Sequence, residues 1–326
     1  MLQNILITGG TGSWGNELVK QLLEKSLAER IVIFSRNEFN QVTMQRKFND
    51  PRLQFVIGDI RDYNSLLLAM KNIDVVFHLA ALKHVPICEF QPFEAIKTNI
   101  LGTQNIIAAA IVNNVKKVID VSTDKAVAPV NLYGMTKAVG EKLIIQANMI
   151  SDTKFICIRG GNAIGSNGSA IPLFQQQILQ TNSISLTDKN MTRFFLSLPA
   201  AIDLLFKATE VGIGGETFVM HMPSYTLQTI AEAMIQLYGN SQTKIVEIGI
   251  RPGEKLHEVL ISKDESFLSY SYDKNYYLIL PSINPRSIIE HYKLLGLEKI
   301  AMEEYSSQSF ILDKSNFIAH LQGVSI

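Results

Sequence analysis

Two residues with complementary chemistry, Tyr133 and Lys137, lie four positions apart in a helix-like stretch. Residues four apart share one face of a helix, so the lysine ammonium can lie close to the tyrosine phenol. A nearby cation lowers the pKa of a tyrosine, and the positive charge of an oxidised nicotinamide would lower it further. The phenolate can then take a proton from a hydroxyl group while a hydride leaves the same carbon atom. A packed tyrosine beside a solvated lysine is the alternative.

A hydroxyl, an acid and an amine stand side by side at Thr123, Asp124 and Lys125. Oxidation or epimerisation at a carbon that carries a hydroxyl needs only a hydroxyl, the tyrosine and its lysine. Elimination of water from a hydroxy ketone also needs a base for the proton on the carbon next to the carbonyl and an acid for the departing hydroxyl. Asp124 is the candidate acid and Lys125 the candidate base, provided that desolvation keeps Lys125 partly neutral near pH 7. A salt bridge at a strand end is the alternative.

Glycines recur every third position after the first predicted strand. They permit a tight turn, close approach of the backbone to a pyrophosphate, and close packing of the next helix on the strand. The N-terminus of that helix offers free N–H groups to phosphates, so the pattern predicts a dinucleotide site. The residues predicted to form it are Gly9, Thr11, Gly12, Ser13, Trp14 and Gly15.

The second predicted strand runs into Ser35, Arg36 and Asn37, with no acidic residue before Glu38. An NAD site usually has an Asp or Glu here, which binds the ribose 2′-hydroxyl. Ser35 and Arg36 can instead hold a 2′-phosphate by hydrogen bond and charge. The sequence therefore favours NADP over NAD, and a surface arginine is the alternative.

Further candidates for cofactor binding follow the third and fourth strands, at the edge where an open α/β sheet binds ligands. Asp59 can accept a hydrogen bond from the adenine amino group, and Ile60 follows it. Ala80 and Ala81 are small enough for a flat ring to approach, and Lys83 lies just beyond them.

The elements that must position these residues alternate through the first half of the chain. Short apolar runs predict strands at 4–8, 30–34, 53–57, 74–79, 117–122 and 154–159. Amphipathic stretches between them predict helices at 16–25, 63–70, 94–113 and 133–148. Strands that are apolar on both faces and separated by helices predict an α/β fold with a doubly wound parallel sheet of the Rossmann type.

After about residue 160 the alternation breaks, and shorter elements predict a smaller mixed α/β lobe that closes over the sheet. We expect a dinucleotide-binding domain at 1–160, joined by a returning segment near 199–222, and a substrate-binding lobe at 161–326. The elements predicted in this half are 171–180, 199–211, 217–220, 227–238, 244–248, 276–280 and 314–321.

Composition excludes several other classes of protein. Of 326 residues, 47% are hydrophobic and 18% are charged, which argues against a disordered chain. The 30 basic and 30 acidic residues balance, so a general nucleic-acid binder is disfavoured. No apolar run reaches the roughly 18 residues of a membrane helix, and no basic segment precedes the first strand. We therefore expect a cytoplasmic protein that spans no membrane.

Metal and disulfide chemistry have little support in the sequence. The two cysteines, Cys88 and Cys157, cannot form a disulfide framework or a cysteine-rich metal site. The histidines show no ligand spacing with cysteines or carboxylates, so no metal is predicted. They lie at positions 78, 84, 221, 257, 291 and 320.

Taken together, these residues resemble the extended short-chain dehydrogenase/reductase superfamily. Longer stretches are similar to one branch, the inverting UDP-N-acetylglucosamine 4,6-dehydratases of bacterial pseudaminic-acid and capsule pathways. The Asp124–Lys125 pair and the Arg-Pro-Gly-Glu-Lys segment are specific to a small set of families, and Tyr133 with Lys137 looks most like the pseudaminic-acid members. The similar stretches are 7–13, 34–38, 80–86, 97–99, 122–126, 191–194 and 251–255.

The resemblance implies a tightly held NADP, also contacted by Tyr133 and Lys137, that is reduced and reoxidised within one turnover. Tyr133 would deprotonate the C4 hydroxyl beside Thr123, Lys125 would remove the C5 proton, and Asp124 would assist loss of the C6 hydroxyl. Hydride return to C6 and reprotonation of C5 from the opposite face would give UDP-2-acetamido-2,6-dideoxy-β-L-arabino-hexos-4-ulose. The implied substrate is UDP-N-acetylglucosamine, and the implied assembly is a homo-oligomer, a hexamer by analogy.

The resemblance also implies which residues bind the substrate, mostly in the second lobe. Arginine suits a pyrophosphate because its planar fork donates twice, and a glutamate can accept from ribose hydroxyls. Ion pairs that stabilise the lobe are the alternative for the charged members. The candidates are Lys83, Asn99, Asn162, Thr187, Arg193, Arg251 and Glu254.

Two positions depart from the family pattern. Gly160 stands where the family usually has a tyrosine, and Asn167 stands where it usually has an arginine. Loss of an aromatic ring and a cation near the substrate leaves open a member that releases the 5,6-ene or retains C5. The sequence also allows a UDP-sugar 4-epimerase or reductase of the same fold, or a redox-sensing binding module that has lost catalysis.

Overall fold

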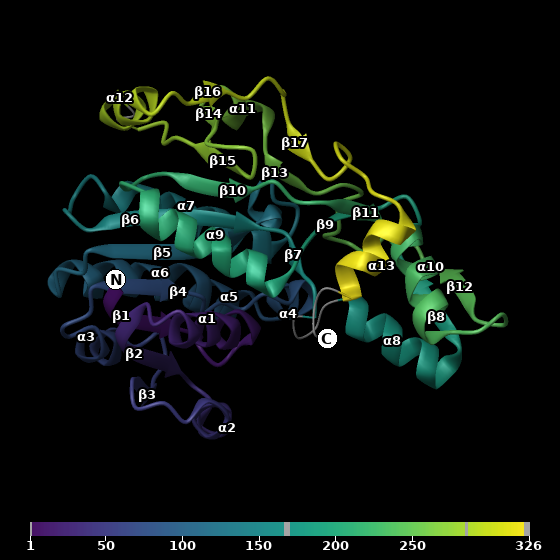
Figure 1. The fold of residues 1–326 in the computed structure, drawn as a ribbon, viewed down its shortest axis with the longest axis horizontal. Coiled ribbons are helices and arrows are strands. Elements are labelled where there is room, and N and C mark those ends of the chain that lie inside the picture. The colour runs from purple at the N-terminus through teal and green to yellow at the C-terminus, as the bar shows by residue number, and fades with distance from the viewer. Residues whose placement is uncertain (1, 166–169, 284–285, 323–326) are drawn as a thin grey trace.

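A computed structural model describes residues 2–165, 170–283 and 286–322 of the chain. It contains a ten-stranded sheet, flanked by helices, and a group of smaller elements beside one end of that sheet (Figure 1). Within the described ranges, no helix has the length and apolar character that crossing a bilayer requires.

Six parallel strands from the first half of the chain form the centre of the sheet. In space they are ordered β3-β2-β1-β4-β5-β6, and the order reverses between β1 and β4. This reversal is the switch point at which doubly wound sheets bind ligands, so the predicted Rossmann-type fold is confirmed. The strands are β1 (Leu2–Thr8), β2 (Ala28–Ser35), β3 (Leu53–Ile57), β4 (Val75–His78), β5 (Lys117–Thr123) and β6 (Lys154–Gly160).

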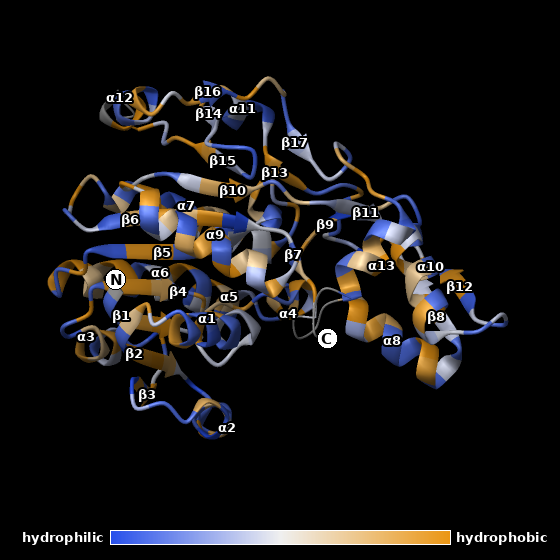
Figure 2. Cartoon of the chain, in the orientation of Figure 1, coloured by the Kyte–Doolittle hydropathy of each residue, from blue (hydrophilic) through white to orange (hydrophobic). Residues whose placement is uncertain are grey.

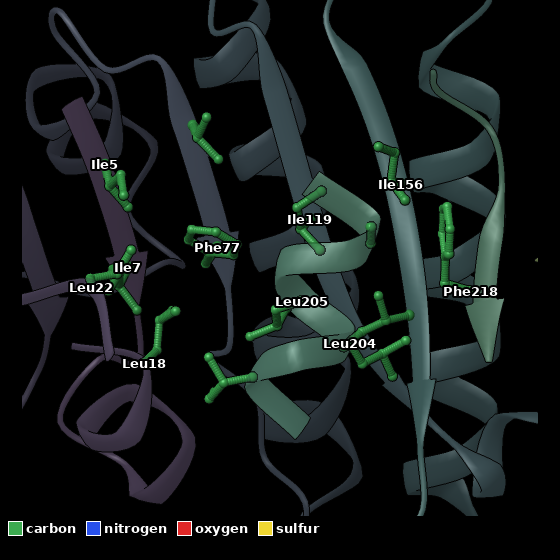
Figure 3. Packing of buried hydrophobic residues seen from close by; sticks show 14 of the residues in the cluster. Ile5, Ile7, Leu18, Leu22, Phe77, Ile119, Ile156, Leu204, Leu205 and Phe218 are labelled. Carbon is green, nitrogen blue, oxygen red and sulfur yellow. The ribbon is translucent and has the colours of Figure 1, made fainter. Parts of the chain in front are cut away.

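Apolar residues point to both faces of the sheet, because side chains alternate along a strand. Ile5 and Ile7 pack on the helices of one face, whereas Leu6 packs on those of the other. Figure 3 shows the first of these interfaces, where leucines of α1 and α9 meet the strands. Each fully buried side chain of this kind contributes about 1.5–3 kcal/mol relative to exposure.

Helices cover both faces of the sheet. One face carries α1 (Ser13–Glu24) and α9 (Leu198–Val211), and the other carries α3 (Tyr63–Ala69), α6 (Gly102–Val112) and α7 (Leu132–Ala147). Figure 2 shows the matching pattern, with hydrophobic colour on the central strands and alternating colour along α1 and α9.

Strands from beyond residue 160 extend the sheet past β6. The first is β10 (Thr217–Met220), which lies parallel to β6 and follows α9 in the segment that we expected to return. The next are β15 (Tyr276–Ile279), β14 (Ser269–Ser271) and β16 (Glu298–Lys299), which lie antiparallel. The division at residue 160 stays a prediction, because this one sheet takes strands from both sides of it.

The smaller elements have their own apolar core, in which Ile178, Ile230 and Phe317 are buried. Its helices are α8 (Ala170–Thr181), α10 (Leu227–Tyr238) and α13 (Lys314–Gln322), and its paired strands are β8 (Ser183–Leu186) and β12 (Lys244–Glu247). A second group connects this core to the sheet. It contains β7 (Asn162–Ala163), β9 (Thr192–Leu196), β11 (Ser224–Thr226), β13 (Val259–Ile261) and β17 (Tyr305–Ser306).

Some helices differ from the sequence-based prediction. The predicted helix at 94–113 is divided into α5 (Pro92–Ile96), a π-helical turn at Lys97–Leu101, and α6. Within the described ranges, the helices that were not predicted are α2 (Glu38–Phe48), α4 (Val85–Phe90), α11 (Lys263–Ser266) and α12 (Arg286–Leu294). In α2 only Gln41 and Met44 are buried, so its sequence lacks the apolar stripe that predicts a helix.

Candidate active site

A cleft of about 710 Å³ opens at the carboxyl edge of the sheet, across the switch point. It collects residues from the ends of β1 to β6, as expected for a doubly wound sheet. Every residue predicted to bind the dinucleotide lines it, except Lys137. These lining residues are Gly9, Thr11, Gly12, Ser13, Trp14, Gly15, Ser35, Arg36, Asn37, Asp59, Ile60, Ala80, Ala81, Lys83 and Tyr133.

The turn after β1 has a geometry that only glycine permits. Gly9 has a φ of +65°, and a Cβ there would lie 2.9 Å from the Cα of Ala80, so a side chain would be both strained and obstructed. A Cβ on Gly15 would lie 2.1 Å from the carbonyl oxygen of Gly10. The N-cap residue of α1 is Gly12, which has no side chain to cap the helix, and a helix N-terminus offers N–H donors to an anion. The turn therefore fits the pyrophosphate of a dinucleotide.

At the end of β2, the residues predicted to select the cofactor line the cleft. Nε2 of Gln41 donates to the hydroxyl oxygen of Ser35 over 3.0 Å, which fixes that side chain. The side chain of Arg36 is 55% exposed and lies 3.8 Å from Asp59. Oδ1 of Asn37 accepts from the N–H of Asn40 and thereby caps α2.

The side chain of Asn99 holds the loop after β4 in place by hydrogen bonds to its backbone. Its Oδ1 accepts from the N–H of Leu82, and its Nδ2 donates to the carbonyl of Leu82 and to the hydroxyl of Thr136. Asn99 is buried and does not line the cleft. Both of its amide hydrogens are used in bonds that fix this loop, and the substrate contact that we predicted for Asn99 stays a prediction.

The predicted acid and base lie at the end of β5, where Asp124 begins a single 3₁₀ turn. Asp124 is fully buried, and its Oδ1 accepts from the Thr123 hydroxyl and from Nζ of Lys125, each over 2.9 Å. Its Oδ2 has no hydrogen-bond partner among the described residues. Thr123 and Lys125 line the cleft, whereas Asp124 is not among its lining residues and lies directly behind them.

Lys125 differs in charge from our expectation. Burial opposes its charge, but the attraction of Asp124 and Glu258 outweighs burial and raises the pKa of Lys125 above its usual range. Nζ of Lys125 lies 3.5 Å from Oε1 of Glu258. Lys125 is therefore an ammonium near pH 7, and our expectation of a partly neutral amine was wrong.

Tyr133 also differs in its resting ionisation. It lines the cleft at the start of α7, but burial raises its pKa, and the opposing effects of Lys137 and Lys125 do not compensate. Lys137 is buried, and its Nζ lies 3.2 Å from Oδ2 of Asp120 on β5. The sequence analysis expected a lowered pKa for Tyr133, but it did not include the burial of the phenol or the carboxylate of Asp120.

Candidates from the second half of the chain differ in whether they line the cleft. Asn162 lines it, and its Nδ2 donates to the carbonyl of Phe194 over 3.2 Å. Arg193 donates to the carbonyls of Thr192 and Leu256 and lies 3.8 Å from Glu258. Thr187, Arg193, Arg251 and Glu254 are not among the lining residues, so their predicted contacts with UDP stay predictions.

The Arg-Pro-Gly-Glu-Lys segment at 251–255 packs against the start of α7. Nδ2 of Asn131, the N-cap residue of α7, donates to the carbonyl of Gly253 over 2.8 Å. Lys255 donates to the carbonyl of Val127. Oε2 of Glu254 is buried and has no hydrogen-bond partner among the described residues. The segment thus connects the second half of the chain to the helix that carries Tyr133.

A family model described as polysaccharide biosynthesis protein matches residues 5–280. The chain belongs to this family.

Two other predictions concern Asn167 and metal binding. Asn167, the second departure from the expected pattern, lies outside the described residues. Among those residues, no group of three or more His, Cys, Asp or Glu is arranged to hold a metal ion.

Two relatives in this family carry different names. The chain is 47% identical over 285 residues to the UDP-N-acetylglucosamine 4,6-dehydratase (inverting) of Campylobacter jejuni strain 81-176, covering 86% of this chain and 84% of that protein. It is 44% identical over 314 residues to the UDP-glucose 4-epimerase of Rickettsia bellii strain OSU 85-389, covering 94% and 91%. The predicted resemblance to the inverting dehydratases is confirmed.

Solved structures place the fold in the same group. The X-ray structure of Pen from Bacillus thuringiensis is 38% identical, with a TM-score of 0.90 and 98% of each chain covered. The dTDP-glucose 4,6-dehydratase DesIV from Streptomyces venezuelae, solved with NAD and TYD bound, is 23% identical with a TM-score of 0.72. The match covers 78% of this chain and 86% of the DesIV chain, and it shows a shared fold.

Three charged or titratable residues near the site were missed by the sequence analysis. Asp120 interrupts an apolar strand, and a carboxylate in such a strand is a signal that it has a buried partner. His78 lies in the neighbouring strand, 3.9 Å from Asp120. Glu258 had no local signal, because it reaches Lys125 only through the folding of the second half of the chain.

Proposed function

We propose that this protein is a C5-inverting UDP-N-acetylglucosamine 4,6-dehydratase, a hydro-lyase that uses a bound nicotinamide dinucleotide. One observation carries the proposal: Asp124, whose Oδ2 lacks a partner among the described residues, is hydrogen-bonded to Lys125, and Lys125 lines the cleft together with Tyr133. An enzyme that only oxidised and re-reduced C4 would need neither the acid nor the second amine. By family analogy we also propose a homo-oligomer, such as a hexamer.

The dinucleotide would be held by the glycine turn after β1, by the end of β2 and by the small residues after β4. Bound there, a nicotinamide supplies oxidation by accepting a hydride and reduction by returning it. We propose NADP as the cofactor, because β2 ends without an acidic residue and Arg36 is available at the mouth of the cleft for a 2′-phosphate. Ser35 can donate its hydroxyl hydrogen to the same group.

Oxidation at C4 would begin when Tyr133 takes the proton of the C4 hydroxyl. The phenolate needs cations to offset burial. Burial raises the pKa of Tyr133, and the positive charges of Lys137 and Lys125 offset part of that rise. Asp120 holds Lys137 in place from β5. We infer that Thr123 orients the reacting hydroxyl, since it lines the cleft beside Tyr133.

Elimination of water would follow from a proton shift within the Asp124–Lys125 pair. Movement of one proton over 2.9 Å, from Nζ of Lys125 to the carboxylate of Asp124, gives a neutral amine and a carboxylic acid with no change in net charge. Lys125 then takes the C5 proton, the C5–C6 double bond forms, and the C6 oxygen leaves as water with the proton of Asp124. The pair thereby returns to its resting charges.

The proposed product requires two further bonds. A hydride adds to C6, and a proton adds to C5 from the face opposite to the one that lost it. The substrate would be oriented by its UDP end, and our proposed contacts for it are Asn162, Thr187, Arg193, Arg251 and Glu254. The order of the steps matters, because the ketone at C4 makes the C5 proton acidic enough for an amine to remove.

A UDP-sugar 4-epimerase is the second candidate, and it is favoured by the 44% identity to the Rickettsia bellii protein of that name. An epimerase would reduce the 4-ketone directly and lose no water. A dehydratase that releases the 5,6-ene or retains C5 is a variant of the first candidate, because Gly160 departs from the family pattern.

Incubation of the purified protein with UDP-N-acetylglucosamine in heavy water separates these candidates. The proposed function predicts a product lighter by one water, with deuterium and inverted configuration at C5 in its proton NMR spectrum. Lys125→Ala should abolish the C5 exchange while cofactor binding persists. A product of unchanged composition would support the epimerase, and no conversion at all would favour a binding module.

A further inference from the structure

A second carboxylate lies beside Lys125, in addition to that of Asp124. Glu258 is 3% exposed, and its Oε1 lies 3.5 Å from Nζ of Lys125 and 3.8 Å from Nε of Arg193. Its Oε2 is buried and has no hydrogen-bond partner among the described residues. Burial of an ionised carboxylate costs free energy unless nearby cations compensate its charge. Lys125 and Arg193 are the cations that compensate the buried charge of Glu258.

The fold fixes Glu258 from outside the Rossmann-type sheet. Glu258 immediately precedes β13, which pairs with β17. Its N–H donates to the hydroxyl of Ser307 over 2.9 Å, and its carbonyl accepts from the N–H of Ser307 over 2.8 Å. Ser307 is fully buried and is itself bound to Thr192. The backbone of Glu258 is therefore rigidly held, and its side chain approaches Lys125 across the junction between the two halves of the chain.

We propose that Glu258 is a positioning residue for Lys125, which orients the amine and stabilises the ammonium that forms when Lys125 takes the C5 proton. The proposal rests on the proposed function, because it assigns Glu258 a part in that step. An amine whose protonated form is stabilised is a stronger base. Glu258 would thus increase the basicity of Lys125 without touching the reacting sugar.

The other charges around Lys125 make this support necessary. Asp124 adjoins it on the same turn, and Tyr133 faces it from α7. Three further cations repel the positive charge of Lys125. They are Lys83, from the loop after β4, and Arg193 and Lys255, from the second half of the chain. Once Asp124 holds the proton for the C6 hydroxyl, Glu258 is the carboxylate that remains to offset these cations within the described part of the site.

Glu258→Gln tests the proposal, because it removes the charge and keeps the shape of the side chain. The measurement is the rate at which acetic anhydride acetylates Lys125 at pH 9, resolved by peptide mass spectrometry and referred to the exposed Lys71 of the same sample. By Coulomb's law at 3.5 Å, even in a water-like dielectric, removal of the carboxylate lowers the pKa of Lys125 by about one unit. We expect Lys125 to be acetylated at least about threefold faster, because the larger neutral fraction outweighs the weaker nucleophile.

Two matched variants complete the experiment. Glu258→Asp keeps the charge and should return the rate of acetylation close to that of the wild type, whereas loss of a merely structural contact would not be repaired by the shorter side chain. Glu303→Gln removes one carboxylate at a side chain that is 88% exposed, and it should leave the rate unchanged. An unchanged rate in Glu258→Gln, or equal rates in Glu258→Gln and Glu258→Asp, would overturn the proposal.

The acetylation uses no substrate, so it decides on Glu258 separately from the proposed function. In the dehydration assay, we expect Glu258→Gln to slow C5 deuterium exchange at least about tenfold. The first step, in which C4 of the sugar is oxidised and the cofactor is reduced, should persist. Equal slowing of both steps would contradict the assignment to Lys125. Absence of dehydration in the wild-type protein would instead contradict the proposed function.

Discussion

The ring of Trp14 lies against Gly160 at the end of β6. A Cβ on Gly160 would lie 3.3 Å from Cη2 and 3.5 Å from Cζ2 of the indole, and both residues line the cleft. Trp14 is the single tryptophan of the chain, and Gly160 is the position at which the resembling family usually has a tyrosine. The indole thus fills the space that a larger side chain at 160 would need, so the departure from the family pattern has a steric partner.

Gly160→Tyr should therefore be costly alone and less costly together with Trp14→Phe. Overpacking of this kind destabilises a protein by about 1–3 kcal/mol, and residues in contact give coupling energies of about 0.5–3 kcal/mol. The measurement is urea unfolding of the wild type, both single variants and the double variant. Additive effects of the two substitutions would show that Trp14 and Gly160 do not share this space.

Asp124→Asn should lower the rate of dehydration by about 10²–10⁴-fold, because an amide cannot deliver a proton to the departing C6 hydroxyl. Reduction of the bound cofactor, followed by its absorbance, should persist because Tyr133 and Lys137 are unchanged. Asp152→Asn, at an exposed carboxylate that does not line the cleft, is the matched control and should keep the wild-type rate. Retention of most activity in Asp124→Asn would indicate an epimerase.

Arg36→Ala should weaken NADP binding about tenfold or more and leave NAD binding nearly unchanged. A charged hydrogen bond from Arg36 to the 2′-phosphate would contribute about 1.5–3 kcal/mol, and NAD has no phosphate there. Calorimetric titration of both dinucleotides measures the difference. Arg46→Ala, at an exposed arginine of α2, controls for the lost charge. Equal weakening of both cofactors would contradict the proposed role of Arg36.

The sequence predicted the parts of the molecule that depend on local patterns. Short apolar runs such as those of β1 and β5, separated by amphipathic stretches, predicted the sheet, and the glycines of the first turn predicted the dinucleotide site. The helix α2 was missed because its exposed surface has no apolar period, and its ends depend on Asn37 and on Asn49 in the left-handed region. Local signals of this kind are weak compared with an amphipathic stripe.

The charge states of the site could not be predicted in the same way. Burial of Tyr133, the approach of Asp120 to Lys137, and the approach of Glu258 to Lys125 are long-range results of packing. Each of them changes a pKa by a desolvation or a charge that the neighbouring residues in the sequence do not reveal. The residue types that carry chemistry could therefore be predicted, whereas their protonation in the resting protein required the structure.

Stability should fall between pH 7 and pH 5 because of His78. This residue is buried on β4, where Nδ1 lies 2.8 Å from the Thr8 hydroxyl and Nε2 lies 3.2 Å from the Thr103 hydroxyl. Burial lowers the pKa of His78 to about 4, and Lys137 lowers it further against the opposing effect of Asp120. Below the ordinary pKa of about 6.5, the unfolded chain binds a proton that the folded chain does not, so acid favours unfolding.

The expected loss from His78 is about 2 kcal/mol in the free energy of unfolding between pH 7 and pH 5. Urea unfolding at the two pH values measures it in the wild type and in His78→Gln, which cannot titrate in this range. The variant should be less stable at pH 7, because a buried hydrogen-bonded pair is disturbed, but its stability should fall by about 2 kcal/mol less on acidification. His84→Gln, at an exposed histidine of the loop after β4, makes the same replacement away from the buried pair and is the matched control. If His78→Gln and the wild type lost equal stability, His78 would have to be protonated in the folded protein.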